Sequence, residues 1–305
     1  MADTPTSPSP LIFDRALIRA RRRRAALLGS APFLLDRVAD DLAERLSAVL
    51  RRFDLAVDLG TPGETVRAAL HRLGSVATIV AADAVSATDT KRGPPLVTAD
   101  EEALPFRDGS LDLVVSALAL QFVNDLPGVL VQVRRALKPD GLFLAALIGG
   151  DTLTELRQSF AAAESEVEGG VSPRVAPFAD LRDLGALLQR AGFALPVTDA
   201  DRVTVRYDSA FALMHDLRRM GATNALLDRR RTPLKRATLT RMAEIYAQRF
   251  ADDDGRVRAT FEIVWLSGWA PHPDQQQPLK PGSAQARLAD ALGTREISTG
   301  EKAGR

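Results

Sequence analysis

The sequence predicts an α/β fold in which a mostly parallel sheet carries helices on both faces. Short, continuous apolar runs alternate with segments of helical periodicity between residues 55 and 148. Strands that are apolar along their whole length are typical of parallel sheets covered on both sides. The first run ends in Asp58 and is followed by the glycine turn 59–64 and a helix-period segment at 65–73. This order is that of a nucleotide-binding unit, in which a buried strand leads through a tight turn into a helix.

The elements are predicted in chain order from these runs and from the turn residues between them. The first five strands are expected at residues 55–59, 77–82, 96–99, 111–116 and 142–148. Helices are expected at 65–73 and 126–137, and Lys138-Pro-Asp-Gly141 is predicted to be a turn because of its Pro and Gly. Further helices are expected at 151–166, 179–191, 211–220 and 234–250, with a loop at 169–177 and strands six and seven at 198–206 and 260–269.

Four segments differ in composition and define the expected organisation. Residues 1–10 are rich in Pro, Ser and Thr and are predicted to be disordered. Residues 11–52 form an N-terminal helical segment, and residues 53–270 form the main domain, with a helical cap at about 209–250 inserted between strands six and seven. Residues 271–305 are expected to be a flexible tail with a short helix near 284–292.

Arginines are concentrated in the N-terminal helical segment, at Arg15, Arg19 and the run 21–24. Such a run is a solvated helix face, a contact with an acidic partner, or a lid over a ligand pocket. The sequence does not choose among these three interpretations.

Composition excludes several classes of protein. With 40 Lys and Arg against 39 Asp and Glu, the chain has no overall charge that would attract nucleic acid. It contains 0 Cys, which excludes disulfides, thiolate metal sites and a thiol nucleophile. No apolar run reaches the roughly 18 to 20 residues that a transmembrane helix needs, so a cytoplasmic protein without a membrane span is expected.

Candidate ligand-binding residues follow the ends of the predicted strands. Gly60 and Gly63 allow close approach of a ligand to the backbone, and Asp83 stands where a carboxylate accepts hydrogen bonds from a ribose. Asp100, followed by Glu101, stands where a carboxylate meets an adenine amino group. Each carboxylate has an alternative role as a solvated loop residue or helix cap. The full candidate set is Asp58, Gly60, Gly63, Asp83, Asp100, Glu101 and Ser116.

Two stretches resemble a large superfamily. Residues 98–116 resemble the segment around strands three and four of class I S-adenosylmethionine-dependent methyltransferases, and residues 136–143 resemble their entry to strand five. This resemblance implies a Rossmann-like class I methyltransferase fold with a seven-stranded sheet, and S-adenosylmethionine as cofactor.

A narrower resemblance extends from about Leu11 to Trp269. The chain is similar to the assembly-factor family for respiratory complex I, the factor 5 type or arginine hydroxylase, and its bacterial relatives. The motifs are Ile12-Phe-Asp-Arg15, Val123-Asn-Asp-Leu-Pro127, Gly149-Gly-Asp-Thr-Leu153, Glu155-Leu-Arg157, Glu168-Gly-Gly-Val-Ser-Pro173, Asp183-Leu-Gly185 and Arg190-Ala-Gly-Phe193. The resemblance implies arginine modification on a subunit of the respiratory NADH dehydrogenase. It places the protein in the cytoplasm, at the inner face of the membrane through that partner, or in the equivalent organelle matrix.

The glycine turn departs from that family. Its usual Asp-Leu-Gly-Cys-Gly-Arg-Gly is replaced by Asp58-Leu-Gly-Thr-Pro-Gly-Glu64. Pro62 removes a backbone donor, and Glu64 is expected near the carboxylate of the cofactor, which it would repel. Both changes predict weaker binding of S-adenosylmethionine, unless Gly63 restores the turn with a shift of one residue.

Asn124 and Asp125 are the catalytic candidates, because they follow strand four and can orient an amine or guanidinium. Asp125 is equally well placed to cap the helix that contains Pro127. The chain has 3 His, without the spacing of a ligand set, so no metal site is predicted. Two other functions remain open: a conventional small-molecule or protein methyltransferase, and a pseudoenzyme that keeps the fold as a binding module.

Overall fold

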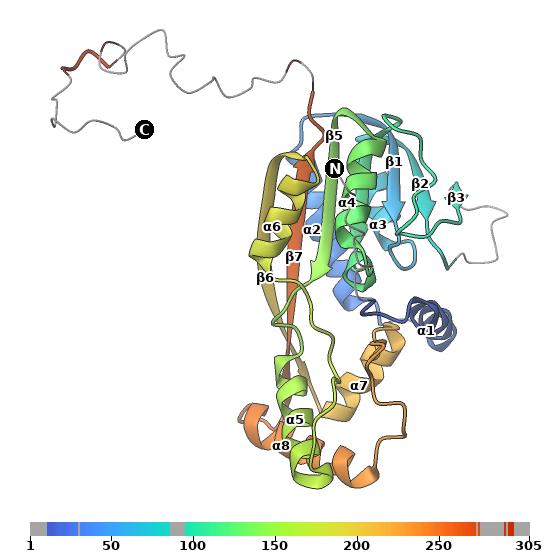
Figure 1. Cartoon of the computed structure of the whole chain (residues 1–305), viewed down its shortest axis with the longest axis vertical. Coiled ribbons are helices and arrows are strands. Elements are labelled where there is room, and N and C mark those ends of the chain that lie inside the picture. Colours follow the sequence, from blue (N-terminus) through green and yellow to red (C-terminus); the bar gives the residue numbers. More distant parts are fainter. Residues whose placement is uncertain are drawn as a thin grey trace, which may run out of the picture. The chain divides into compact units, whose positions relative to one another are not determined.

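The sheet of the computed structural model has seven strands in the order β3-β2-β1-β4-β5-β7-β6. The structure describes residues 11–29, 31–85, 95–272, 274, 290 and 292–295. β7 pairs antiparallel with both β5 and β6, whereas the pairs formed by β1 to β5 are parallel. The predicted mostly parallel, seven-stranded sheet is therefore confirmed (Figure 1).

The element bounds follow the predicted ones closely in the centre of the sheet and less closely at its edges. The strands are β1 (Phe53–Leu59), β2 (Val76–Ala82), β3 (Leu96–Val97), β4 (Leu111–Ala117), β5 (Leu137–Ile148), β6 (Ala194–Tyr207) and β7 (Val257–Trp269). The helices are α1 (Arg15–Leu28), α2 (Phe33–Ser47), α3 (Thr65–Leu73), η1 (Leu120–Phe122), α4 (Leu126–Ala136), α5 (Thr154–Glu168), α6 (Leu181–Arg190), α7 (Ala210–Arg219) and α8 (Arg236–Phe250). The short helix expected near residues 284–292 lies largely outside the described residues, as does the segment 1–10.

The turn predicted at Lys138-Pro-Asp-Gly141 is wrong, because these residues lie within β5. Leu137 already pairs with Leu111, and the register shifts before Leu113 pairs with Leu142. Asp140 takes a φ of 58° inside this irregularity. A β-bulge therefore accommodates the Pro and Gly that suggested a turn.

Helices cover both faces of the sheet and produce two apolar layers. α2 and α3 pack on one face, and α4 and α6 pack on the other (Figure 1). α7 and α8 lie between β6 and β7 in the chain, and α8 packs against α5, as expected for a cap inserted at that point. Within the described residues, no helix combines the length and apolarity needed to cross a membrane.

This topology creates a crevice at the carboxyl ends of the central strands. β1 lies between β2 and β4, so the connections that leave β1 and β4 diverge to opposite sides of the sheet. Open α/β sheets bind their ligands at such a point, outside the carboxyl ends of the strands.

Candidate functional site

The glycine turn after β1 forms the floor of this crevice. Gly60 takes a φ of 70° and Gly63 a φ of 74°, in the left-handed region that favours glycine. A Cβ atom on Gly60 would lie 2.9 Å from Cγ of Glu101, whereas one on Gly63 would meet nothing within 4 Å. Gly60 is thus required for close packing, and Gly63 for backbone conformation alone.

Asp58 and Ser116, two candidate residues, are buried at the ends of β1 and β4 and form hydrogen bonds there. The Asp58 carboxylate accepts a hydrogen bond from Nη1 of Arg67 at 2.8 Å, yet burial raises the pKa of Asp58 to about 6. Ser116 donates its hydroxyl hydrogen bond to the carbonyl oxygen of Leu59 at 2.7 Å and so ties β4 to β1. Both residues stabilise the strand ends on which the crevice is built.

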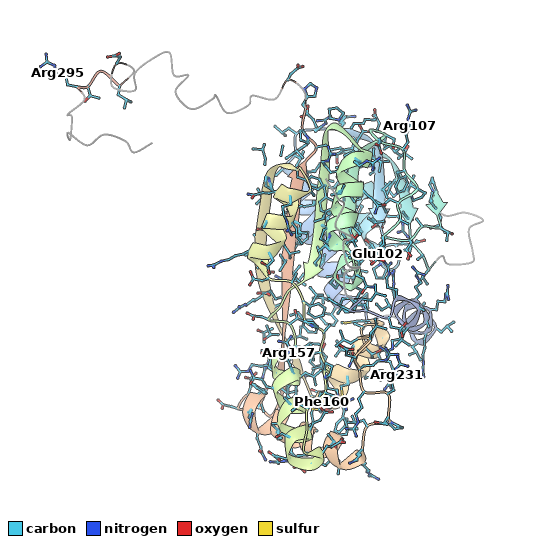
Figure 2. All side chains as sticks on the ribbon, in the orientation of Figure 1. Glu102, Arg107, Arg157, Phe160, Arg231 and Arg295 are labelled. Atoms are coloured by element: carbon cyan, nitrogen blue, oxygen red, sulfur yellow. The ribbon has the colours of Figure 1, made fainter. Side chains whose placement is uncertain are left out.

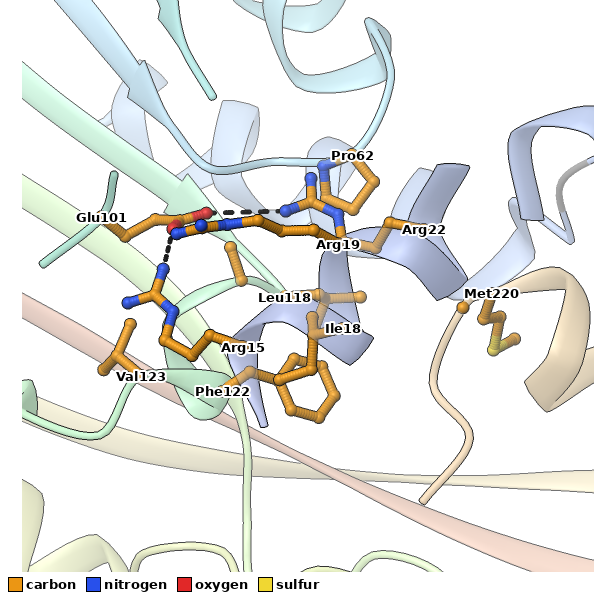
Figure 3. A pocket seen from close by; sticks show the side chains of 12 residues that line it. Arg15, Ile18, Arg19, Arg22, Pro62, Glu101, Leu118, Phe122, Val123 and Met220 are labelled. Carbon is orange, nitrogen blue, oxygen red and sulfur yellow. Dashed lines mark hydrogen bonds and ion pairs between the residues drawn. The ribbon is translucent and has the colours of Figure 1, made fainter. Parts of the chain in front are cut away.

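The carboxylates at the ends of β2 and β3 converge on one face of α1. Nη2 of Arg22 donates to Asp83 at 3.0 Å and to the carbonyl oxygen of Gly60 at 2.8 Å. Nη1 of the same arginine pairs with Glu101 at 3.5 Å (Figure 3). At the start of the helix, Arg15 forms ion pairs with three consecutive acidic residues. Its partners are Asp100 at 2.8 Å, Glu102 at 2.9 Å, and Glu101.

Arg15, Arg19 and Arg22 lie on one face of α1 because residues four and three apart are neighbours on a helix. Arg19 also pairs with Asp100. Burial tends to raise the pKa of Asp100, but the Glu102 amide and the two arginines outweigh it and lower that pKa. This helix face is therefore a lid over the crevice, the third of the interpretations open from sequence, whereas Arg23 and Arg24 are exposed.

The space left under the lid is small. A cavity of about 30 Å³ remains among residues that include Ile18, Pro62 and Phe122, which is room for one or two water molecules. These residues fit a nucleoside, because the Asp83 and Asp100 carboxylates can accept hydrogen bonds from it and Gly60 permits its close approach to the backbone. The side chains of α1 now occupy that space, so a nucleoside enters only if Arg22 and Arg19 leave their partners. Glu64 is exposed at the start of α3, where solvent screens its charge.

The catalytic candidates both have structural partners here. Oδ1 of Asn124 accepts hydrogen bonds from the amides of Ile12 at 2.9 Å and Phe13 at 2.7 Å. The Asp125 carboxylate accepts from the amide of Gly128 at 2.9 Å and caps α4, the alternative role considered for it. Their catalytic roles stay a prediction. In the described part of the chain, no group of three or more His, Asp or Glu is arranged to hold a metal ion.

Sequence reasoning left Arg15, Arg19 and Arg22 out of the candidate set. Their spacing was the available signal, because it places three guanidinium groups on the same helix face. Glu102 was also missed. It pairs with Arg15 and accepts from the backbone amide of Asn124, and so links the lid to the segment after β4.

Comparisons with known proteins concern the fold and the family of the chain. A methyltransferase domain model matches residues 57–145. The mitochondrial arginine-hydroxylase NDUFAF5 of Homo sapiens is 40% identical over 294 residues, which is 93% of this chain and 85% of that protein. The Danio rerio protein of the same name is 39% identical over 92% of this chain and 89% of its own length.

A methyltransferase and a solved structure extend the comparison. The malonyl-[acyl-carrier protein] O-methyltransferase of Laribacter hongkongensis is 35% identical over 88% of this chain and 94% of its own. The YcgJ protein of Bacillus subtilis superposes with a TM-score of 0.51 at 16% identity, covering 76% of this chain and 98% of its own, and so shows a shared fold. The identities and coverage show that the chain belongs to the methyltransferase-fold family of the mitochondrial arginine-hydroxylase NDUFAF5.

Proposed function

We propose that the protein hydroxylates an arginine of a protein acceptor and acts in this way in assembly of the respiratory NADH dehydrogenase. One observation carries the proposal. The human arginine-hydroxylase is 40% identical over 93% of the chain, compared with 35% over 88% for the Laribacter methyltransferase, and the general methyltransferase model matches only the core at residues 57–145. The regions outside that core, α1 with its lid arginines and the cap helices, are therefore largely included in the shared sequence. We expect the protein to act in the cytoplasm at the inner membrane face through its partner, or in the organelle matrix.

S-adenosylmethionine is the proposed cofactor. Asp83 would accept hydrogen bonds from its ribose hydroxyls and Asp100 from its adenine amino group. Gly60 would let the cofactor lie close to the backbone. The bound cofactor supplies a cationic sulfonium group and an activated methyl group. Isothermal titration with S-adenosylmethionine tests this assignment directly. The absence of heat at millimolar ligand would favour the pseudoenzyme alternative over both enzymes.

Mass spectrometry of NADH dehydrogenase subunits tests the reaction. Subunits from the parent strain, from a deletion strain and from the complemented strain are digested and compared. We expect one arginine to carry the mass of an added oxygen atom in the parent and complemented strains only. Hydroxylation converts C–H to C–O–H. With molecular oxygen as the oxidant, one oxygen atom enters the arginine and the other leaves as water, with two electrons and two protons from a reductant, so the modification should also depend on aeration. An added methylene mass would instead indicate a conventional methyltransferase, and no mass difference would contradict arginine modification.

A second candidate function is methyl transfer to the carboxylate of a malonyl group on an acyl-carrier protein. The specific observation in its favour is the 35% identity to the Laribacter enzyme across 94% of that enzyme. Transfer of label from methyl-labelled cofactor to malonyl-carrier protein, in the absence of any other acceptor, would support it.

A further inference from the structure

A second hollow lies between α5 and the loop that follows it. Its volume is about 550 Å³, within the range of roughly 300–1,000 Å³ that ligand sites occupy. The walls are mostly apolar and come from Ala161, Val171, Pro173, Val175, Pro177 and Phe178. Gly150, just past the carboxyl end of β5, Ser172 and Arg174 also line it. The last lining residue is Arg157, in the first turns of α5 (Figure 2). We call this hollow the α5 groove.

The outer wall of the α5 groove is held in place by a buried carboxylate. Glu164 is completely buried and accepts hydrogen bonds from the amide of Ser172 at 2.7 Å and its hydroxyl at 2.8 Å. It also accepts from Nε of Arg174 at 2.7 Å. These bonds fix the loop against α5, so the groove exists before any ligand arrives.

The α5 groove adjoins the crevice under the lid. The ring of Phe178, which lines the groove, lies 6.4 Å from the ring of Phe122 at a steep angle. Phe122 in turn lines the small cavity beneath α1. A ligand in the groove would therefore reach the carboxyl edge of the sheet at this aromatic pair, on the side of β5.

The α5 groove contains one arginine whose positive charge no neighbouring carboxylate neutralises among the residues described. Two arginines line it, and Glu164 neutralises Arg174. Nη2 of Arg157 donates only to carbonyl oxygens, those of Gly150 at 3.2 Å and Thr152 at 3.4 Å, and pairs with no carboxylate among the residues described. A partly buried guanidinium without a counter-ion is costly, and a carboxylate is the group that it binds best, through two parallel hydrogen bonds.

We propose that the α5 groove binds the acceptor as an extended protein segment, in which a carboxylate side chain near the target arginine pairs with Arg157. This inference rests on the proposed function. The apolar walls suit the flanking side chains of a segment, and the single unneutralised cation selects an acidic residue at one position. That pairing sets the register of the segment, and repulsion by Arg157 keeps the target arginine out of the groove.

Binding of defined peptides tests the proposal without any turnover. Fluorescein-labelled nonapeptides are made with one arginine at the centre and alanine elsewhere, and an aspartate or asparagine is moved through the other positions. We expect aspartate to bind more tightly than asparagine at one or two fixed positions by about tenfold or more, the effect of one charge-assisted hydrogen bond. The variant Arg157→Gln should lose that preference. Arg182→Gln, which removes the same charge from the exposed surface of α6, should keep it.

A second variant separates the register contact from the shape of the groove. Glu164→Gln weakens the anchoring of the loop and should reduce binding of aspartate and asparagine peptides alike. Equal binding of both peptides to the native protein, or an aspartate preference that survives Arg157→Gln, would overturn the proposal. Binding of malonyl-carrier protein in place of the peptides, with the same dependence on Arg157, would overturn it in favour of the second candidate function. Failure of the mass-spectrometric test would reject the reaction yet leave the peptide result interpretable.

Discussion

Removal of Arg22 should strengthen cofactor binding, because the lid competes with the cofactor for Asp83. Arg22 donates to Asp83 at 3.0 Å and to the carbonyl oxygen of Gly60 at 2.8 Å, and the Arg22 and Asp83 side chains are each only 14% exposed. A hydrogen bond to a charged group contributes about 1.5–3 kcal/mol. A nucleoside that takes Asp83 must break this contact first. Arg22→Ala removes that cost, so affinity should rise by about 10-fold to 150-fold.

The assay is isothermal titration of S-adenosylmethionine and S-adenosylhomocysteine into the native protein and two variants. Arg23→Ala is the matched control, since it removes the same charge from an exposed position on the same helix. Urea unfolding of all three proteins checks that the lid variant retains its fold. Only Arg22→Ala should bind more tightly.

Weaker binding by Arg22→Ala would refute this reasoning. It would mean that Arg22 contacts the bound cofactor and closes over it, and that Arg22 does not compete with the cofactor for Asp83. Equal tightening by Arg23→Ala would also refute it, because the effect would then come from net charge and not from the contact with Asp83.

The convergence of the acidic site residues was predictable from sequence. Asp83 and Asp100 follow apolar runs that are strands of one parallel sheet, and the carboxyl ends of such strands meet at one edge. Local pattern alone established both the strands and this edge. The same reasoning failed at Lys138-Pro-Asp-Gly141, because turn residues describe local preference, whereas the pairing of Leu137 with Leu111 depends on a strand elsewhere in the chain.

Docking of α1 over the crevice was not predictable from sequence. The spacing of its arginines defines a charged helix face but not the surface that receives it. That surface is selected by contacts at the start of the helix, where Asn124 binds the amides of Ile12 and Phe13, and Asp14 donates its amide to Ala225. These partners lie more than a hundred residues away in the chain, and the periodicity of a helix carries no information about such distant contacts.

Three further predictions follow from the site. Gly63→Ala should lower the free energy of unfolding by about 1–2 kcal/mol from backbone strain alone. Gly60→Ala should lower it further, because the added Cβ would lie 2.9 Å from Glu101. Urea denaturation measures both losses, and equal losses would contradict the packing argument. Asn124→Ala should speed hydrogen exchange at the amides of Ile12 and Phe13, whereas lost turnover with unchanged exchange would instead support its catalytic role. Burial raises the pKa of Asp58 from 3.8 to about 6, so the folded state binds this proton more tightly than the unfolded state. The stability contributed by protonation is full below pH 3.8 and is lost as the pH rises to about 6, a change on the order of 3 kcal/mol. Asp58→Asn cannot titrate, so its unfolding free energy should fall less between those pH values than that of the native protein. Parallel pH profiles would show that folding does not raise the pKa of Asp58.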